Sequence, residues 1–288
     1  LKTVLYCEGF TKTIIVVTHS PHFVTTDTIN KTHVFFRKNW ERLKWICSVT
    51  NADNNKVADV EIFRTLLFAT KMLLVEGPTD REVVQAIFSH LQTKTWKIET
   101  DRIANVSETL QACNRIDFTT YQIIPVYGCK NASKVQLFCK TINLPCLCLL
   151  DLDKFVKEEN GELKFNSIPD ESYQEKLSTY YKKKDISTFI SEQFDEFALY
   201  LKSELETFVW KGDLEDAILS SKNPTLEKAI LDSLHIDPDK KKNHQKSIHD
   251  LIKDKLKTPL SFEERNEFCN LIIDVPEIKR FIDFLKKK

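Results

Sequence analysis

The sequence predicts an α/β fold in which helices pack against a parallel sheet. Three short apolar runs support this prediction, at Met72–Val75, Tyr121–Val126 and Pro145–Leu150. Apolar runs of this length, bounded by turn residues, are typical of strands buried on both faces of a parallel sheet. Segments with helical periodicity separate the runs, and strands that alternate with helices at these spacings indicate βαβ units.

The first helix follows the first strand after a Gly77-Pro78 break. The residues from Thr79 to Glu82 have the S/T-x-x-E pattern of a capping box, so we expect the helix to begin there. Its apolar face recurs at helical spacing and consists of Val83, Val84, Ile87, Phe88 and Leu91. Glu76 then ends a strand and Asp80 lies in the first helical turn, at the sheet edge where open α/β folds bind ligands.

Further elements are expected along the chain. A polar segment covers 93–120, and a second helix covers Ala132–Asn143, with Val135, Leu137, Phe138 and Ile142 as its apolar residues. A helical insertion, charged and rich in aromatic residues, covers about 170–206. A fourth strand follows at Thr207–Trp210, and the region 224–288 reads as helices broken near prolines.

We expect four segments. Residues 1–38 contain strand patterns at Ile14–Thr18 and Val34–Phe36, and 39–68 form a linker followed by a helix. The parallel-sheet domain with its insertion covers 69–256, and C-terminal helices cover 257–288. The chain begins with Leu1 rather than methionine, so we expect it to be part of a longer protein.

The composition is that of a globular protein with no net charge. The 288 residues are 42% hydrophobic and 29% charged, with 42 basic and 42 acidic residues. A neutral total neither requires nor excludes a nucleic-acid partner, because it can hide local patches. No apolar run is long enough to span a membrane and no signal peptide is visible. We therefore expect an intracellular protein, cytoplasmic or nuclear, without membrane association.

The eight cysteines form no CxxC pair. Free cysteine behaves as a small buried hydrophobe, so we interpret most of them as core thiols in a reducing compartment. A zinc site at Cys139, Cys146 and Cys148 is the weaker alternative, because the usual C-x₂₋₄-C spacing is missing.

Acidic residues follow three of the four predicted strands. Glu76 ends the first, Asp151 and Asp153 follow the third, and Asp213 and Glu215 follow the fourth. Strand side chains alternate, so Asp151 and Asp153 are expected to point to the same side. The ends of parallel strands share one edge, and carboxylates ~4 Å apart repel by about 4 kcal/mol at an effective dielectric of 20. The acids therefore require cations or must take up protons, unless each one merely caps a loop or helix.

Oxygen ligands without histidine favour Mg²⁺ or Mn²⁺ over zinc. Two such ions ~3.5–4 Å apart are the usual arrangement for phosphodiester chemistry. A strand-ending glutamate with a DxD two strands later resembles the Toprim domain, the metal-binding fold of topoisomerases, bacterial-type primases and OLD (overcoming lysogenization defect) family nucleases. In this Rossmann-like fold, the resemblance implies that Glu76 and Asp151 are catalytic and that Asp153 binds metal.

Three motifs resemble the OLD family in particular. LVEGPTD is similar to its LVEG-x-x-D, which implies that Asp80 joins the metal site. The turn Gly128-Cys129-Lys130-Asn131 resembles its G-x-K-N, which implies phosphate or DNA contacts from Lys130 and Asn131. WKGDLE resembles the late acidic motif, which implies Glu215 at the second metal, with Asp213 as its rival. OLD enzymes also use a later lysine; Lys246 is the expected one, and Lys242 and Lys255 compete with it.

The segment VVTHSPHFV is similar to the switch-histidine segment near the end of ABC-type ATPase heads, with His19 as the switch residue. OLD proteins join such a head to a C-terminal Toprim, so residues 1–38 resemble the end of an ATPase domain. The chain contains no G-x-x-x-x-G-K-[ST] phosphate loop. ATP binding, and a homodimer, are therefore expected only through an upstream region, and a free-standing ATPase is excluded.

The resemblance implies a metal-dependent DNA endonuclease or nickase with two Mg²⁺ or Mn²⁺ ions. The alternative is a catalytically degenerate Toprim that serves as a scaffold or nucleic-acid-binding module of an ATPase-linked protein. A topoisomerase or primase is less favoured, because the chain has room for neither a separate tyrosine-bearing domain nor a zinc module. DNA versus RNA and nicking versus double-strand cleavage stay open.

Overall fold

The computed structural model describes residues 33–36, 44–48, 65–66, 69–101, 120–127, 129–141, 144–159, 162–165, 194–237 and 247–286. The chain divides into two compact units, Leu1–Phe68 and Ala69–Lys288. In the first unit, β1 (His33–Phe36) pairs antiparallel with β2 (Lys44–Ser48). The expected linker therefore contains a strand, because Trp45-Ile46-Cys47 favours β structure and finds a partner in β1. His19 lies outside the described residues, as does most of the helix expected before residue 69.

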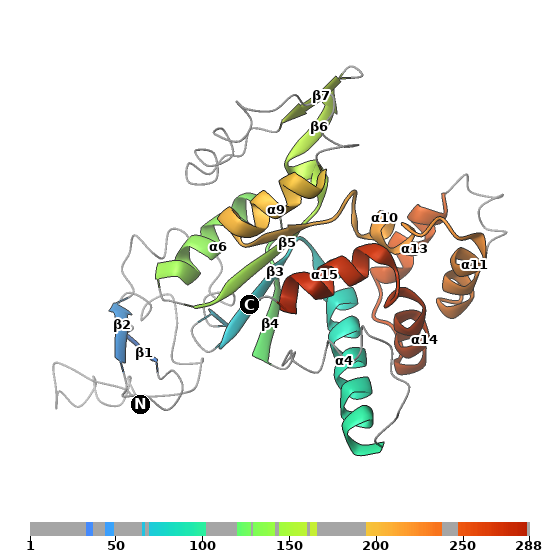
Figure 1. Ribbon diagram of the computed structural model, residues 1–288, viewed down its shortest axis with the longest axis horizontal. Coiled ribbons are helices and arrows are strands. Elements are labelled where there is room, and N and C mark those ends of the chain that lie inside the picture. The colour runs from blue at the N-terminus through green and yellow to red at the C-terminus, as the bar shows by residue number, and fades with distance from the viewer. Residues whose placement is uncertain are drawn as a thin grey trace, which may run out of the picture. The chain divides into compact units, whose positions relative to one another are not determined.

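The second unit is built on a parallel sheet of four strands, which confirms the predicted α/β fold. The strands are β3 (Lys71–Val75), β4 (Tyr121–Pro125), β5 (Cys146–Leu150) and β8 (Thr207–Val209). Their order in the sheet is β4-β3-β5-β8, and every neighbouring pair is parallel (Figure 1). All five residues of β5 are buried, which explains why its sequence is uniformly apolar.

Helices cover both faces of the sheet. In Figure 1, α6 (Cys129–Thr141) and α9 (Phe194–Leu205) lie on one face, and α4 (Pro78–Asp101) and α15 (Pro276–Lys286) lie on the other. The predicted apolar face of α4 is buried throughout, and it joins Leu73 and Leu149 in one core. On the α6 face, Gln136 donates a 2.6 Å hydrogen bond to the carbonyl of Leu205, which ties α6 to the end of α9.

Several details differ from the predicted elements, among them the start of α6, which lies at Cys129 rather than at Ala132. The helix α4 continues to Asp101, through the beginning of the expected polar segment. It begins at Pro78, two residues earlier than a cap at Thr79 implies, because proline suits the first helical position. Leu137, expected to be buried, is 36% exposed, because α6 turns only part of its apolar surface toward the sheet.

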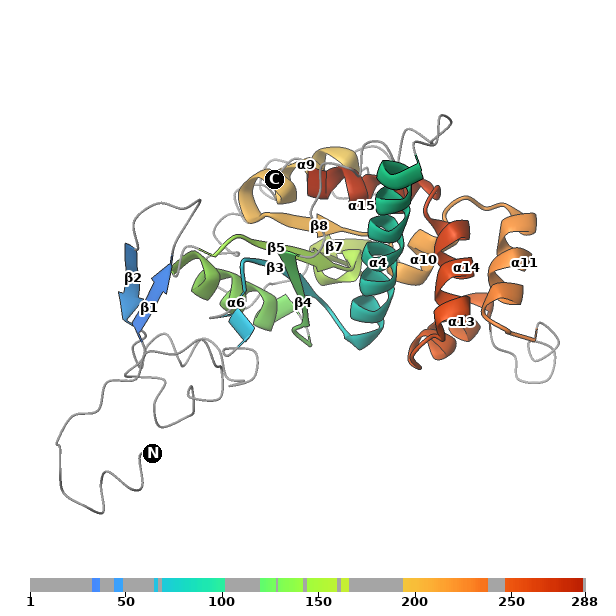
Figure 2. The same ribbon diagram turned by 90° about the horizontal axis from the view of Figure 1, so that it is seen from below.

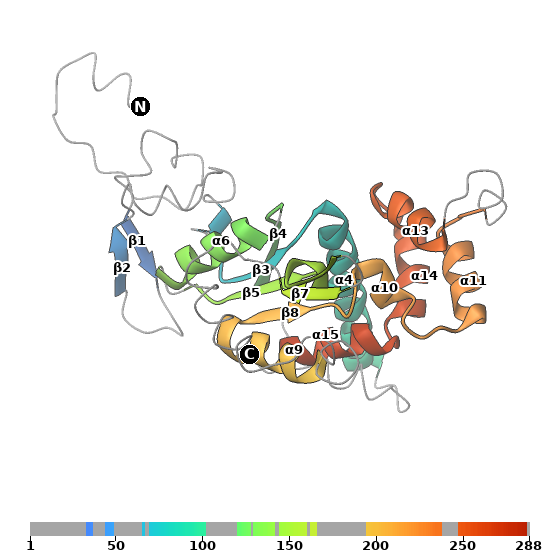
Figure 3. The same cartoon turned by 90° about the horizontal axis from the view of Figure 1, so that it is seen from above.

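Shorter elements complete the unit. The 3₁₀ turn η4 (Leu152–Lys154) leads into a hairpin that the sequence did not indicate, β6 (Val156–Glu159) and β7 (Glu162–Phe165). The helices α10 (Leu214–Ile218), α11 (Pro224–Ser233), α13 (Ile248–Leu256) and α14 (Phe262–Ile272) gather beyond the carboxyl ends of the strands (Figures 2 and 3). These helices contribute to the same hydrophobic core as the sheet.

The four cysteines among the described side chains are buried free thiols, at positions 139, 146, 148 and 269. Burial raises the pKa of the Cys146 thiol well above its usual value, which disfavours the thiolate that zinc requires. In the part of the chain that the structure describes, no helix has both the length and the apolar character needed to cross a bilayer.

Candidate metal centre

The carboxyl ends of the strands are held together by hydrogen bonds that continue past the sheet. The amide of Trp210 donates to the carbonyl of Leu150 (3.2 Å), and the amide of Leu152 donates to the carbonyl of Gly212 (3.0 Å). On the other side, the amide of Tyr127 donates to the carbonyl of Glu76 (2.8 Å). These bonds align the ends of β3, β4, β5 and β8, so that the acids after them lie along one edge. We call this set the acidic rim: Glu76, Asp80, Asp151, Asp153, Asp213 and Glu215.

A first acidic group consists of Glu76, Asp151 and Asp153, each of which places one carboxylate oxygen within 4.8 Å of the others. The reason for this convergence differs from the expected strand alternation. The strand β5 ends at Leu150, and Asp153 reaches the group through the 3₁₀ turn η4, with a side chain that is 69% exposed. The ammonium of Lys154 lies in the same group, 2.9 Å from Glu76 Oε1 and 2.8 Å from Asp153 Oδ1.

Asp80 is part of the start of α4. Its Oδ2 accepts a 3.0 Å hydrogen bond from the amide of Gly77, and the carbonyl of Gly77 accepts from the amide of Arg81 (3.1 Å). Gly77 is therefore the capping position, and the capping box predicted from Thr79 to Glu82 is wrong. Glu82 instead forms a 2.7 Å ion pair with Arg265. With Pro78 at the first helical position, the cap lies two residues earlier than predicted, and Asp80 rather than Glu82 accepts the hydrogen bond from the capping residue.

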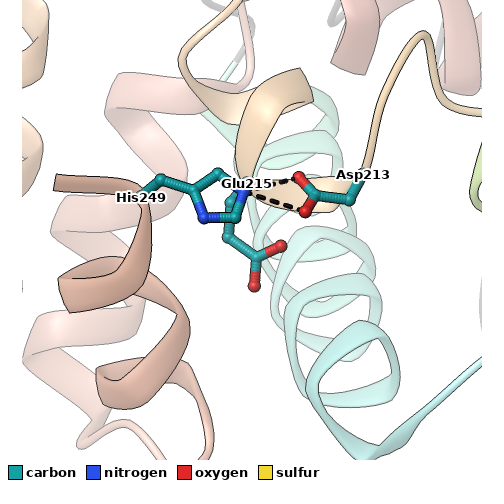
Figure 4. Close-up of side chains that lie close together, drawn as sticks. All are labelled: Asp213, Glu215 and His249. Carbon is teal, nitrogen blue, oxygen red and sulfur yellow. Dashed lines mark hydrogen bonds and ion pairs between the residues drawn. The ribbon is translucent and has the colours of Figure 1, made fainter. Parts of the chain in front are cut away.

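A second group consists of Asp213, Glu215 and His249, whose ligand atoms also lie within 4.8 Å of one another (Figure 4). Asp213 caps α10 by accepting from the amide of Asp216 (2.9 Å). Both of its oxygens face His249 Nε2, at 2.9 and 2.8 Å. His249 was not predicted from the sequence, because it lies on α13 with no strand end or motif near it. The capping box of Ser247 and Asp250 sets the start of that helix.

Among the predicted lysines, only the side chain of Lys255 belongs to the described residues. Lys255 forms a 2.6 Å ion pair with Glu264, and Lys242 and Lys246 lie outside the described residues. Lys253 is the lysine of α13 that faces the rim: its Nζ is 3.9 Å from Asp213 Oδ2. The side chain of Lys130 also lies outside the described residues. The side-chain amide of Asn131 donates to the carbonyl of Val126 (3.0 Å), which fixes the turn after β4.

The electrostatics of the rim show strong mutual repulsion. Burial, together with the charges of Asp80, Glu76, Asp153 and Asp213, raises the pKa of Asp151 to about 9. Burial also raises the pKa of Asp80 to about 6, against the hydrogen bond from Gly77 and with the charges of Glu76 and Glu215 adding to the increase. The charge of Asp213 adds to the increase in the pKa of Asp151, and the charge of Glu215 adds to the increase in the pKa of Asp80. The two groups are therefore electrostatically coupled.

In the second group, the pKa values shift in different directions. Burial is the largest influence on Glu215 and raises its pKa. Burial acts in the same direction on Asp213, but hydrogen bonds from Asp216 and His249 outweigh it, so the pKa of Asp213 is lowered. For His249, burial opposes protonation, yet the hydrogen bond and charge of Asp213 raise its pKa overall. The environment thus favours the ionised form of Asp213 and disfavours that of Glu215.

The residues of the rim fit a divalent cation. Glu76 Oε2 and Asp151 Oδ1 are buried without a hydrogen-bond partner, and an unpaired buried carboxylate oxygen is costly. A divalent cation would satisfy both atoms and would offset the repulsion that adds to burial in raising the pKa of Asp151. The donor set of the first group suits Mg²⁺ or Mn²⁺. The nitrogen of His249 in the second group adds a ligand that transition metals accept more readily than Mg²⁺.

A parallel α/β fold with a strand-ending glutamate and a DxD on its carboxyl edge defines the class of Toprim domains. Residues 67–153 match the family model for the overcoming lysogenization defect protein-like TOPRIM domain. This segment of the chain therefore carries an OLD-like Toprim match, which includes Glu76, Asp80, Asp151 and Asp153. The second group lies beyond the matched residues. A search of the curated proteins gave no match.

Proposed function

We propose that this protein is a metal-dependent endonuclease or nickase that hydrolyses DNA phosphodiesters at the acidic rim. A Toprim domain indicates a metal-dependent function on nucleic acid, and such domains generally belong to nucleases and primases. The observation that supports the finer proposal is that there are two groups of three potential metal ligands, Glu76–Asp151–Asp153 and Asp213–Glu215–His249, whose acids follow the strand ends of one sheet. Two adjacent cations are the common arrangement for in-line displacement at phosphorus.

The chain's own residues have separable tasks. Glu76, Asp151 and Asp153 would hold one cation, and Asp80, Glu215 and the Asp213–His249 pair would hold the other. Divalent cations, when bound, activate a water and stabilise the leaving oxygen. The proton that Asp151 carries in the metal-free state leaves when the carboxylate becomes a ligand.

Lys253 is a second candidate for the phosphate-stabilising lysine, beside Lys246, whose prediction stays open because that residue lies outside the described part of the chain. The side chain of Lys253 is 48% exposed, and its Nζ lies 3.9 Å from Asp213, so it can reach a phosphate bound at the rim. An ammonium there stabilises the negative charge that develops during displacement. Coupling to an upstream ATPase head and dimerisation through it stay predictions, because residues 1–32 lie outside the described part of the chain.

The test is nicking of supercoiled plasmid with Mg²⁺ or Mn²⁺. Asp151→Ala is expected to reduce the rate at least about 100-fold, as the loss of a catalytic group does. Asp232→Ala, an exposed acid on α11, is the matched control and should cleave like the unmodified protein. Undiminished cleavage by Asp151→Ala, in protein free of contaminating nuclease, would show that the acidic rim does not perform the reaction.

A second candidate is a non-catalytic Toprim that binds nucleic acid or serves as a scaffold. The observation in its favour is that protein cations already contact the rim: Lys154 pairs with Glu76, and His249 contacts Asp213. Calorimetry distinguishes the two candidates. Retained DNA binding, without any heat of Mg²⁺ or Mn²⁺ binding, would favour the non-catalytic function.

A further inference from the structure

Lys154 places a protein cation inside the first acidic group. Its Nζ is 2.9 Å from Glu76 Oε1, 2.8 Å from Asp153 Oδ1 and 3.0 Å from Asp153 Oδ2. The side chain is only 25% exposed, unlike that of a freely solvated surface lysine. The ammonium therefore bridges two of the three carboxylates that converge there.

The local backbone holds Lys154 in this position. It is the last residue of η4, and its amide donates to the carbonyl of Asp151 (3.3 Å). The next residue, Phe155, is fully buried and packs edge-on against Phe197 of α9, with ring centroids 5.8 Å apart. Since Phe155 anchors the end of the turn, the stem of Lys154 emerges beside the carboxylates.

The ammonium of Lys154 pairs with only some of the carboxylate oxygens in the first acidic group. Glu76 Oε1 is paired with Lys154, whereas Glu76 Oε2 and Asp151 Oδ1 are buried without a partner. The unpaired oxygens are those that a divalent cation would take. A divalent cation and the lysine therefore share Glu76, and their like charges repel across a distance of a few ångströms.

We propose that Lys154 is the resident cation of the first acidic group and that a divalent ion must displace it from Glu76 in order to bind. Lys154 thereby sets the divalent-ion concentration at which the site fills. This inference rests on the proposed metal site, and it does not require that the site cleave DNA. Removing the lysine charge should tighten divalent-ion binding, whereas a lysine that merely supports the fold should leave binding unchanged or weaken it.

The experiment is a titration with Mn²⁺, in which electron paramagnetic resonance measures the free ion. Lys154→Met, which keeps the length of the stem without its charge, should lower the Kd for Mn²⁺ about tenfold, equivalent to ~1.4 kcal/mol. Lys154→Arg, which keeps the charge, should stay near the unmodified protein. The control is Lys257→Met, because Lys257 forms a 2.8 Å ion pair with Asp254 on the exposed side of α13.

Unchanged or weaker Mn²⁺ binding by Lys154→Met would overturn the inference. Lys154→Gln provides a second neutral variant if the methionine variant does not fold, as judged by circular dichroism. If the unmodified protein binds Mn²⁺ but cleaves no DNA, the nuclease proposal fails while the Lys154 comparison still decides this one. If neither the unmodified protein nor the neutral variants bind Mn²⁺, the inference is wrong. If the neutral variants bind Mn²⁺ and the unmodified protein does not, the inference is supported.

Discussion

Asp151 is the residue on which the charges of four other acids of the rim act. It follows the fully buried strand β5, and burial is the largest reason why its pKa rises to about 9. Its Oδ1 has no hydrogen-bond partner, so the neutral form is favoured until a cation binds. Metal binding and proton release are therefore coupled at this side chain.

The first prediction concerns the pH dependence of metal binding. The affinity for Mn²⁺ should rise with pH by about tenfold per unit while one proton is displaced. The rise should flatten above pH 9, where Asp151 is already ionised, and should steepen below pH 6, where Asp80 also carries a proton. Calorimetry in buffers of different ionisation enthalpy measures the released protons. An affinity that stays constant between pH 6 and 9 would contradict the raised pKa of Asp151.

The second prediction concerns the stability of the metal-free protein. Folding raises the pKa of Asp151 from 3.8 to about 9, so the folded state binds the proton more tightly. This contribution to stability is complete at low pH and is lost as the pH rises toward 9. Asp151→Asn cannot ionise, so its Tm in EDTA should exceed that of the unmodified protein near pH 9, by ~2–4 °C per kcal/mol. Thermal melts from pH 6 to 9 check this, and the same pH slope in both proteins would argue against it.

At the scale of elements, the short turns after the strands determine where the acidic side chains lie. The loop between Trp210 and α10 contains Gly212, where a Cβ would lie 2.3 Å from Asp216 Oδ2 and 2.9 Å from Asp216 Cβ. The amide of Asp216 donates a hydrogen bond to the side chain of Asp213. A residue without a Cβ at position 212 therefore leaves space for Asp216 and for the helix cap that orients Asp213. At Gly77, before α4, the nearest atom to an added Cβ is 3.5 Å away, an ordinary contact.

The third prediction compares these two glycines. Gly212→Ala should destabilise the protein by ~1–3 kcal/mol, as overpacking usually does, and should weaken Mn²⁺ binding by displacing Asp213 and Glu215. Gly77→Ala is the matched control, with an expected loss below about 1 kcal/mol. Urea denaturation measures the free energy of unfolding of both variants. If Gly212→Ala proves as stable as Gly77→Ala, the close packing around Asp216 is not a constraint.

At the scale of the whole second unit, the C-terminal helices share a core with the sheet that carries the rim. Phe281 of α15 stacks on Phe88 of α4, with ring centroids 6.4 Å apart, and lies 5.3 Å from Phe208 of β8. Arg280, the neighbouring residue, donates to the carbonyl of Val209 and lies over the ring of Phe208 at 4.2 Å. Helix α15 therefore stabilises the strand that leads to Asp213.

The fourth prediction tests this shared core. Phe281→Ala should lower the free energy of unfolding by ~3–5 kcal/mol, because it leaves a cavity between three elements. Phe262→Ala, at a side chain that is 78% exposed, should stay within about 0.5 kcal/mol. Chemical denaturation measures both changes. A small effect of Phe281→Ala would mean that α15 is not part of the cooperative unit.

The sequence alone determined the sheet and the position of the acids along the chain. Buried parallel strands require continuous apolar runs, so β3, β4, β5 and β8 could be found without the structure. The ends of such strands lie on one edge, so the convergence of Glu76, Asp151 and Asp213 also follows from the order of the residues. The matched family model agrees with this reading for residues 67–153.

Only the tertiary structure decided which other groups meet these acids. His249 and Lys253 reach the rim because α13 packs beyond the strand ends, a contact that no local pattern indicates. Lys154 enters the first group through a 3₁₀ turn rather than through strand alternation. Local periodicity reports on a segment's own backbone and burial, whereas the charge around a carboxylate depends on segments distant in sequence. Which basic side chains lie beside the acids is therefore decided by the tertiary packing.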